Sequence, residues 1–166
     1  MAKFTWYNGE VPTNLKITQV YGLIFTRDGR MLLKVENKKR GKVFSLAGGT
    51  PEDYDSDSQA TLRRELIEEV NVTIETPITV GYQEVDEENG KPAYAQFRMT
   101  AIIDNIGPVL PDPDNGETYE RLLTTPSRAI DLLGWGEVGK SQIEEAYRIA
   151  KEKLGLTEFS DLEEYI

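Results

Sequence analysis

The chain of 166 residues contains no cysteine and no histidine. Their absence excludes disulfide frameworks, Cys/His zinc sites, thiol nucleophiles and histidine-dependent catalytic triads. Histidine is the usual base at neutral pH, so proton transfer or metal chemistry here falls to carboxylates, lysine, tyrosine or bound water. The lack of cysteine also makes the cytoplasm the expected location.

Long hydrophobic runs and an excess of positive charge are missing as well. The apolar segments are short and strand-like, as in residues 21–25, whereas a membrane span needs about 18 or more apolar residues. Lysine and arginine number 19 against 29 aspartates and glutamates, which gives a net charge of −10. This charge repels polyanions, so the sequence favours neither duplex DNA nor a membrane as a partner.

The length is typical of a single domain over residues 1–166, because no repeat, low-complexity segment or linker divides the chain. Strand-like segments dominate the first two thirds and helical segments the last, with one helix among the strands. This order predicts an α+β fold, a sandwich built on a mixed β-sheet.

The sequence also predicts where the individual strands and helices begin and end. Strands are expected at 16–26 and 30–36, which an Asp-Gly turn joins as a hairpin, and at 43–47, 74–85, 93–104 and 118–124. One helix is expected from an N-cap at Asp57 or Ser58 to about Val70, and the C-terminal helices cover about 127–155, as 127–133 and 141–154. The tail 158–166 is expected to be a solvated terminus or a short helix.

The segment Arg64-Glu65-Leu66-Ile67-Glu68-Glu69 carries the most informative pattern. At about 100° per helical residue, its three glutamates fall in one sector beside the apolar stripe of the helix. Like charges spaced three or four residues apart destabilise a helix by about 0.2–0.5 kcal/mol per pair. A hard divalent cation would offset this repulsion, because Mg²⁺ and Mn²⁺ prefer oxygen ligands. The alternative is a solvated acidic face on which Arg64 screens Glu68.

A glycine pair precedes this helix. Gly48 and Gly49 follow the apolar strand 43–47 directly. Without a Cβ, they let the backbone approach a ligand closely or expose a carbonyl oxygen to a metal, although a structural turn would also use them. The succession of strand, Gly-Gly, acidic loop and glutamate-rich helix is more specific than any one of its parts.

This succession resembles the signature of the Nudix hydrolase (MutT-like) family, G-x5-E-x7-R-E-U-x-E-E-x-G-U, in which U is a bulky aliphatic residue. Residues 64–72 match the second half of the signature, except that Asn71 replaces the glycine. Asparagine is the best substitute for glycine at a left-handed helix end. In the first half, the loop after Gly49 is one residue longer, and Ser56 stands where the family has a glutamate. Asp55 and Asp57 are the candidate substitutes for that glutamate, and the signature region covers residues 48–72.

The resemblance implies a Nudix-type α/β/α sandwich and a pyrophosphohydrolase. Such an enzyme cleaves a nucleoside diphosphate linked to another group and requires Mg²⁺ or Mn²⁺. Carried onto this chain, the resemblance makes Glu65 and Glu69 the principal metal ligands and Glu68 a further ligand or a partner of metal-bound water. It also makes the Gly48 carbonyl a backbone ligand, and Arg64 a residue that orients the carboxylates.

Family members also use a downstream acidic residue as ligand or base. Glu120 is the first candidate for this role and Glu117 the second, so the general base is left open among Glu65, Glu68 and Glu120. The run 112–116, Asp-Pro-Asp-Asn-Gly, begins like a calcium loop but ends at Leu123 instead of a glutamate. It is therefore interpreted as a turn-rich loop.

The implied chemistry suits these residue types. Divalent cations neutralise diphosphate oxygens and lower the pKa of a bound water, while a carboxylate accepts its proton. Two other interpretations stay open: a Nudix-fold module that senses a nucleotide without cleaving it, which the longer loop favours, and an acidic interaction protein without a site. The expected partner of the enzyme is a small nucleotide or another diphosphate. The sequence leaves the substrate and the oligomeric state open, a homodimer included.

Overall fold

The computed structural model describes residues 1–166 and contains three helices and ten strands. The helices are α1 (Ser58–Val70), α2 (Pro126–Leu133) and α3 (Gly136–Lys153). The strands are β1 (Lys3–Asn8), β2 (Lys16–Phe25), β3 (Met31–Lys38), β4 (Gly41–Ser45), β5 (Ala47–Gly49), β6 (Val72–Ile74), β7 (Ile78–Asp86), β8 (Tyr94–Ile106), β9 (Glu120–Thr124) and β10 (Glu164–Tyr165). None of the helices is long and apolar enough to cross a membrane.

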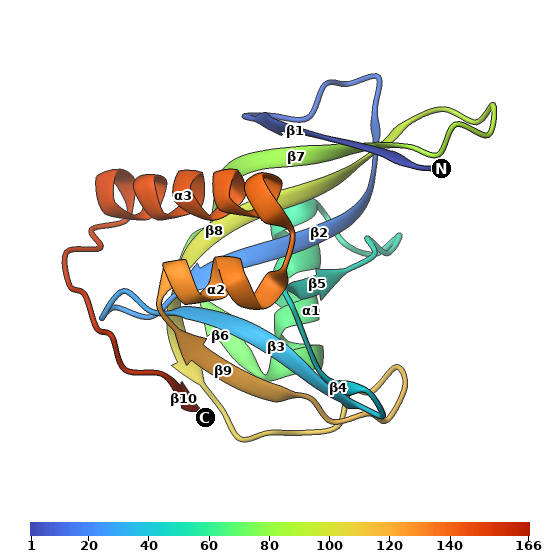
Figure 1. Ribbon diagram of the computed structural model, residues 1–166. Helices are drawn as coiled ribbons and strands as arrows, with labels where there is room; N and C mark the ends of the chain where they lie inside the picture. The colour runs from blue at the N-terminus through green and yellow to red at the C-terminus, as the bar shows by residue number, and fades with distance from the viewer.

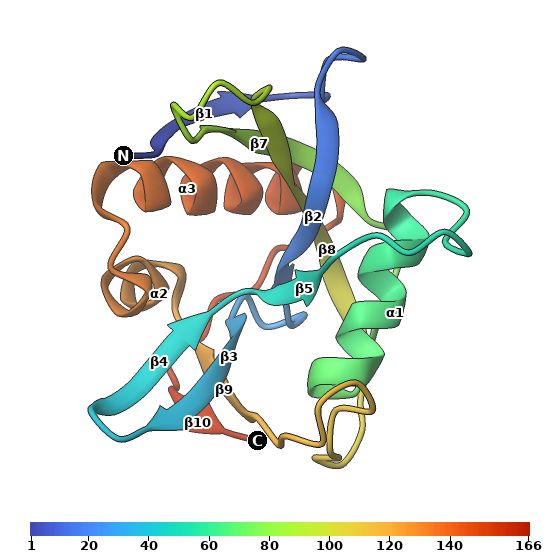
Figure 2. The ribbon, with the colours of Figure 1, turned by 90° about the vertical axis from the view of Figure 1, so that its right-hand side faces the viewer.

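The strands form one mixed sheet between two helical layers. Its order is β1-β7-β8-β2-β3-β9-β10, and β4, β5 and β6 add to β3, β2 and β8. The pairing of β2 with β8 is parallel and the remaining pairings are antiparallel. Helix α1 covers one face of the sheet, and α2 and α3 cover the other (Figures 1 and 2). The predicted α+β sandwich with a mixed sheet is confirmed.

Each face of the sheet has its own hydrophobic core. Side chains alternate between the two faces along a strand, so Val20 and Ile24 of β2 pack with Leu62 and Leu66 of α1. The intervening Leu23 belongs to the second core, which includes buried residues of α2 and α3. Strand β2 is therefore apolar on both faces, as a central strand requires.

The predicted hairpin of β2 and β3 exists only at its turn. The two strands pair at Phe25 and Met31 and then separate, because β4 pairs with β3 and β5 pairs with β2 at the edges that would otherwise meet. Strand β5 occupies the position beside β2 and pairs Gly48 with Tyr21. The separation of β2 and β3 thus places the glycine pair within the sheet, where it faces α1.

Other elements differ from the sequence prediction at their ends. Helix α3 begins at Gly136, five residues before the expected start at 141. The sequence prediction missed the first turn because it contains glycine, a poor helix former that weakens the helical pattern. Strand β1 was not expected from the sequence. Only its two central residues are partly buried, so its sequence shows little alternation of apolar and polar residues. The C-terminal tail forms a short strand instead of a helix, because Glu164 and Tyr165 pair with the free edge of β9.

Candidate metal-binding and catalytic site

Helix α1 carries the three glutamates, and both of its ends are capped. The Asp57 side chain accepts a hydrogen bond from the Ala60 backbone N–H at 2.8 Å. At the other end Asn71 has φ 51° and ψ 53°, the left-handed conformation expected from the sequence, and its side chain donates to the Pro108 carbonyl at 2.9 Å. These caps set where the helix starts and stops, and hence which residues face the sheet.

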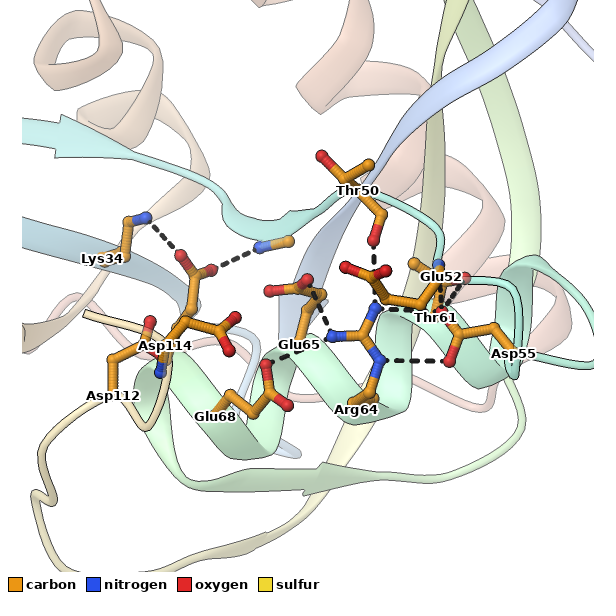
Figure 3. A network of polar contacts seen from close by, with 12 residues as sticks. Lys34, Thr50, Glu52, Asp55, Thr61, Arg64, Glu65, Glu68, Asp112 and Asp114 are labelled. Carbon is orange, nitrogen blue, oxygen red and sulfur yellow. Dashed lines mark hydrogen bonds and ion pairs between the residues drawn. The ribbon is translucent and has the colours of Figure 1, made fainter. Parts of the chain in front are cut away.

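Arg64 lies at the centre of the polar network on this helix (Figure 3). Its Nη1 donates to Glu65 Oε1 at 3.0 Å and to Glu68 Oε2 at 3.2 Å. Its Nη2 donates to the Thr50 carbonyl at 3.0 Å, just after the glycine pair. One guanidinium therefore joins two helix carboxylates to the loop that precedes the helix.

Asp55 anchors the other side of that guanidinium. Its two oxygens accept from Arg64 Nε at 3.0 Å and Nη2 at 2.9 Å, a bidentate pair. One of these oxygens also accepts from the Glu52 N–H and the Thr61 hydroxyl, both at 2.9 Å. The Arg64 guanidinium holds the pKa of Asp55 well below its usual range. Of the two candidates for the displaced signature glutamate, Asp55 makes this contact, and Asp57 is the helix cap.

Glu69 is buried and contacts two strands. Its Oε2 accepts from Lys34 Nζ of β3 at 2.7 Å, and its Oε1 accepts from the Gly48 backbone N–H of β5 at 2.8 Å. Gly48 therefore contacts Glu69 through its N–H. The role that the resemblance implies for the Gly48 carbonyl, as a ligand of the metal, is separate from this contact. Lys34 was not identified from the sequence, although a single lysine inside the apolar run 31–35 is a signal that could have found it.

The glycine pair allows β5 to come this close. A Cβ on Gly48 would collide with the Val20 carbonyl oxygen and lie 2.7 Å from the Tyr21 Cα. A Cβ on Gly49 would lie 2.5 Å from Glu65 Oε1, inside the space of the carboxylate. Both contacts are shorter than side chains tolerate, so this approach of backbone to carboxylate requires glycine.

The loop between β8 and β9 brings further acids to the helix (Figure 3). Carboxylate oxygens of Glu68, Asp112 and Asp114 lie within 4.8 Å of one another. The loop is turn-rich as predicted, since Asp112 Oδ1 accepts from the Asp114 N–H at 2.9 Å. Its acids were not proposed as site residues, because the sequence does not show that this loop folds against α1. Glu117 lies in the same loop and accepts from the Tyr119 hydroxyl at 3.2 Å.

The structure does not bring Glu120 to this group. On β9 Arg121 pairs with Lys34 and reaches the Val70 carbonyl on the α1 side. Because adjacent side chains on a strand point to opposite faces, Glu120 points away from α1. Its Oε1 instead accepts from Asn37 Nδ2 at 2.5 Å and from Lys42 Nζ at 2.7 Å.

Burial and mutual repulsion raise the pKa values of the helix glutamates. Burial raises the pKa of Glu65 to about 7, against the opposing effect of Arg64. The pKa of Glu68 is raised first by burial and then by Asp114, and that of Glu69 is raised mainly by burial, against Lys34. The donor set is all oxygen and short of positive charge. These residues therefore fit a hard divalent cation, which would stabilise their ionised forms.

Solved structures of known proteins share this architecture. A MutT protein from Aliivibrio salmonicida or Vibrio cholerae aligns with a TM-score of 0.56 at 17% identity, over 80% of this chain and 98% of that one. The Escherichia coli ORF135 protein aligns with a TM-score of 0.58 at 18% identity, over 87% and 99%. A proposed NUDIX hydrolase from Listeria monocytogenes aligns with a TM-score of 0.59 at 18% identity, over 82% and 95%. The chain has the Nudix fold.

No protein-family model and no curated protein sequence matches the chain. At these low identities the solved structures establish the architecture, and the chemistry has to be argued from this chain's own residues. In this Nudix fold, the segment 64–72 that matches the second half of the family signature covers the end of α1, its cap Asn71 and the first residue of β6. The glycine pair of β5 faces its carboxylates, as the order of the signature implies.

Proposed function

We propose that this chain is a metal-dependent Nudix pyrophosphohydrolase that cleaves a nucleoside diphosphate linked to another group. The observation that carries the proposal is the cluster of carboxylates on α1 beside Gly48, with raised pKa values and too little positive charge around them. Diphosphate oxygens bridged to such a cluster by Mg²⁺ or Mn²⁺ are a recurring arrangement in phosphoryl transfer. The proposal treats residues 1–166 as one unit, because the sheet includes both β1 and β10.

In this proposal Glu65, Glu68 and Glu69 hold the metal, and Asp112 and Asp114 replace Glu120 as the downstream acids. The cation would neutralise the diphosphate and acidify the attacking water. The chain's own residues position the carboxylates and accept the proton, as the contacts around each carboxylate indicate.

Arg64 fixes the side chains of Glu65 and Glu68 from one side, and Lys34 fixes Glu69 from the other. Glu65 Oε2 and Glu68 Oε1 make no bond to Arg64, so each is open either to the cation or to the proton of the attacking water. Whichever of these two glutamates does not hold the metal through that oxygen is the proposed base. The Gly48 carbonyl is kept as a proposed backbone ligand.

The alternative of a nucleotide sensor without activity drew its support from the longer loop before α1. In the structure this loop keeps its tie to the helix, because Asp55 pairs with Arg64. The extra residue therefore leaves the carboxylates supported, which favours the enzyme over the sensor.

The test is a panel of nucleoside diphosphates linked to sugars, phosphates or a second nucleoside. We expect hydrolysis with Mg²⁺ or Mn²⁺, little with Ca²⁺ and none with excess chelator, because a compact octahedral ion orders the attacking water better. Glu69→Gln should lower the rate by about 100-fold or more, since several kcal/mol of charge stabilisation depend on each ligand. Glu144→Gln, an exposed glutamate of α3, is the control for the loss of one charge. Full activity in chelator, or equal rates for both variants, would refute the proposed function.

A further inference from the structure

A cavity of about 550 Å³ opens on the α2/α3 face of the sheet. Three aromatic residues, Phe4, Tyr21 and Trp135, contribute to its walls, and Ser45 and Arg98 are among its polar lining residues. Cavities of roughly 300–1,000 Å³ with mostly apolar walls and a few converging polar groups typically hold small ligands. This cavity therefore has the size and lining of a ligand site.

The cavity adjoins the carboxylates of α1. Tyr21 lines it and is the residue of β2 that pairs with Gly48. The Tyr21 side chain reaches Gly48, because a Cβ on Gly48 would lie 2.8 Å from Tyr21 Cδ1, and the Gly48 N–H donates to Glu69 at 2.8 Å. On its other side Tyr21 contacts the guanidinium of Arg98, so it lies between the cavity and the Glu69 carboxylate. A ligand whose diphosphate lies at the carboxylates can extend its remaining group into the cavity.

Arg98 is the unusual member of this lining. It is only 4% exposed, yet it forms no ion pair, and its Nη1 has no hydrogen-bond partner. Its Nε donates to Gln142 Oε1 at 3.2 Å, and its guanidinium carbon lies 4.7 Å from the centre of the Tyr21 ring. Burial lowers the pKa of Arg98 to about 10, so the group stays charged at neutral pH. A buried charge without a partner is unfavourable, and it gains most from a ligand that supplies acceptors.

The chemistry of the lining narrows the ligand. A guanidinium has only donors, and the Ser45 hydroxyl is a second buried group without a partner. The complementary ligand therefore presents acceptors at one edge and a flat face to the aromatic rings. Hypoxanthine and guanine carry an oxygen at C6, and uracil carries one at C4, so each presents an acceptor at that position. Adenine and cytosine carry an amino donor at the same position.

We propose that this cavity binds the base of the nucleotide substrate and that Arg98 selects keto bases over amino bases. The inference rests on the proposed function, because it assigns the group beyond the diphosphate. Phe4 and Trp135, the cavity's two exposed aromatic residues, supply stacking surfaces for the base, and stacking on aromatic rings tolerates any base. Discrimination then comes from the donors of Arg98, which meet an acceptor in one class and a donor in the other.

The test uses nucleosides without phosphate or metal, so that no step of hydrolysis is involved. Inosine and adenosine differ at the base only by a 6-oxo against a 6-amino group and its attendant ring proton, and uridine and cytidine form a second matched pair. Dissociation constants come from titrations followed by the indole N–H signal of Trp135. Inosine, with acceptors at O6 and N7, should bind about 5- to 100-fold more tightly than adenosine, the range for a good bidentate contact. Uridine offers a single acceptor at O4, so its advantage over cytidine should have the same sign and be smaller.

Two substitutions of Arg98 separate recognition from folding. Arg98→Met should abolish the preference while keeping the fold, because Arg98 has no carboxylate partner to leave unpaired and makes one hydrogen bond, at 3.2 Å to Gln142 Oε1. Arg98→Lys keeps the charge but loses the forked donors, so the preference should fall without vanishing. Arg148→Met, on the exposed side of α3, removes the same charge elsewhere and should leave the preference unchanged.

Equal binding of inosine and adenosine, tighter binding of adenosine, or no binding of any nucleoside would overturn the assignment of Arg98. These outcomes are distinct from failure of the proposed function. Metal-dependent hydrolysis without a keto preference would support the proposed hydrolase and refute the role of Arg98 in selectivity. A keto preference without hydrolysis would support base binding in the cavity and favour a nucleotide sensor over an enzyme.

Discussion

Glu65 gives a prediction whose sign and size both follow from the structure. The carboxylate is buried beside Glu68 and Glu69, and burial raises its pKa from 4.5 to about 7. Between these two values the folded protein holds a proton that the unfolded chain has released. The free energy of unfolding therefore decreases as the pH rises through this range, and the loss is complete above about pH 7.

Glu65→Gln removes this loss, because glutamine has the same size and carries no charge. One pKa unit corresponds to about 1.4 kcal/mol. The raised pKa of Glu65 therefore lowers the free energy of unfolding by about 3 kcal/mol above neutrality and by about 1 kcal/mol at about pH 5. Arg64 loses one of its carboxylate partners but keeps Asp55 and Glu68. The metal-free variant should therefore be more stable than the unmodified protein by about 3 kcal/mol at pH 8.

The assay is urea unfolding in excess chelator at pH 5 and pH 8. Glu144→Gln, exposed on α3, provides the baseline for removing one charge and should shift the free energy by less than about 0.5 kcal/mol. A variant no more stable than the unmodified protein at pH 8 would refute the reasoning. A gain of the same size at both pH values would also do so, because it would come from a source other than titration of Glu65.

Three further substitutions test the scaffold of the site by the same unfolding assay. Gly48→Ala should cost about 2–3 kcal/mol, because its Cβ would collide with the Val20 carbonyl oxygen, and an unchanged midpoint would contradict the close approach of β5. Asp55→Asn should cost about 2–4 kcal/mol, since it removes the charge of a bidentate pair with Arg64 in which the Asp55 side chain is 5% exposed; a loss below about 1 kcal/mol would show that the pair is solvated. Asn71→Gly should change stability by less than about 0.5 kcal/mol, because glycine accepts the left-handed conformation and only a surface hydrogen bond is lost, whereas a larger loss would mean that the side chain matters more than the backbone.

The amino-acid sequence by itself determined the local parts of the site. The helical period of 3.6 residues places Glu65, Glu68 and Glu69 in one sector, and this depends on spacing alone. The left-handed end at Asn71 is equally local, because few residues other than glycine adopt that conformation easily. The order of strands and helices also sufficed for the fold class, since segments apolar on both faces need a helical layer on each side.

Only the tertiary structure decided which residues meet these glutamates. Lys34 reaches Glu69, and Asp112 reaches Glu68, across long stretches of chain, and no local period encodes such contacts. Glu120 is absent from the site because a strand sends adjacent side chains to opposite faces, so its direction depends on the register of β9 against β3. The same holds for Arg98, which lies beside Tyr21 because β2 pairs with β8 in parallel. Pairing and register are set by packing of the whole sheet, which is why residue spacing alone could not reveal them.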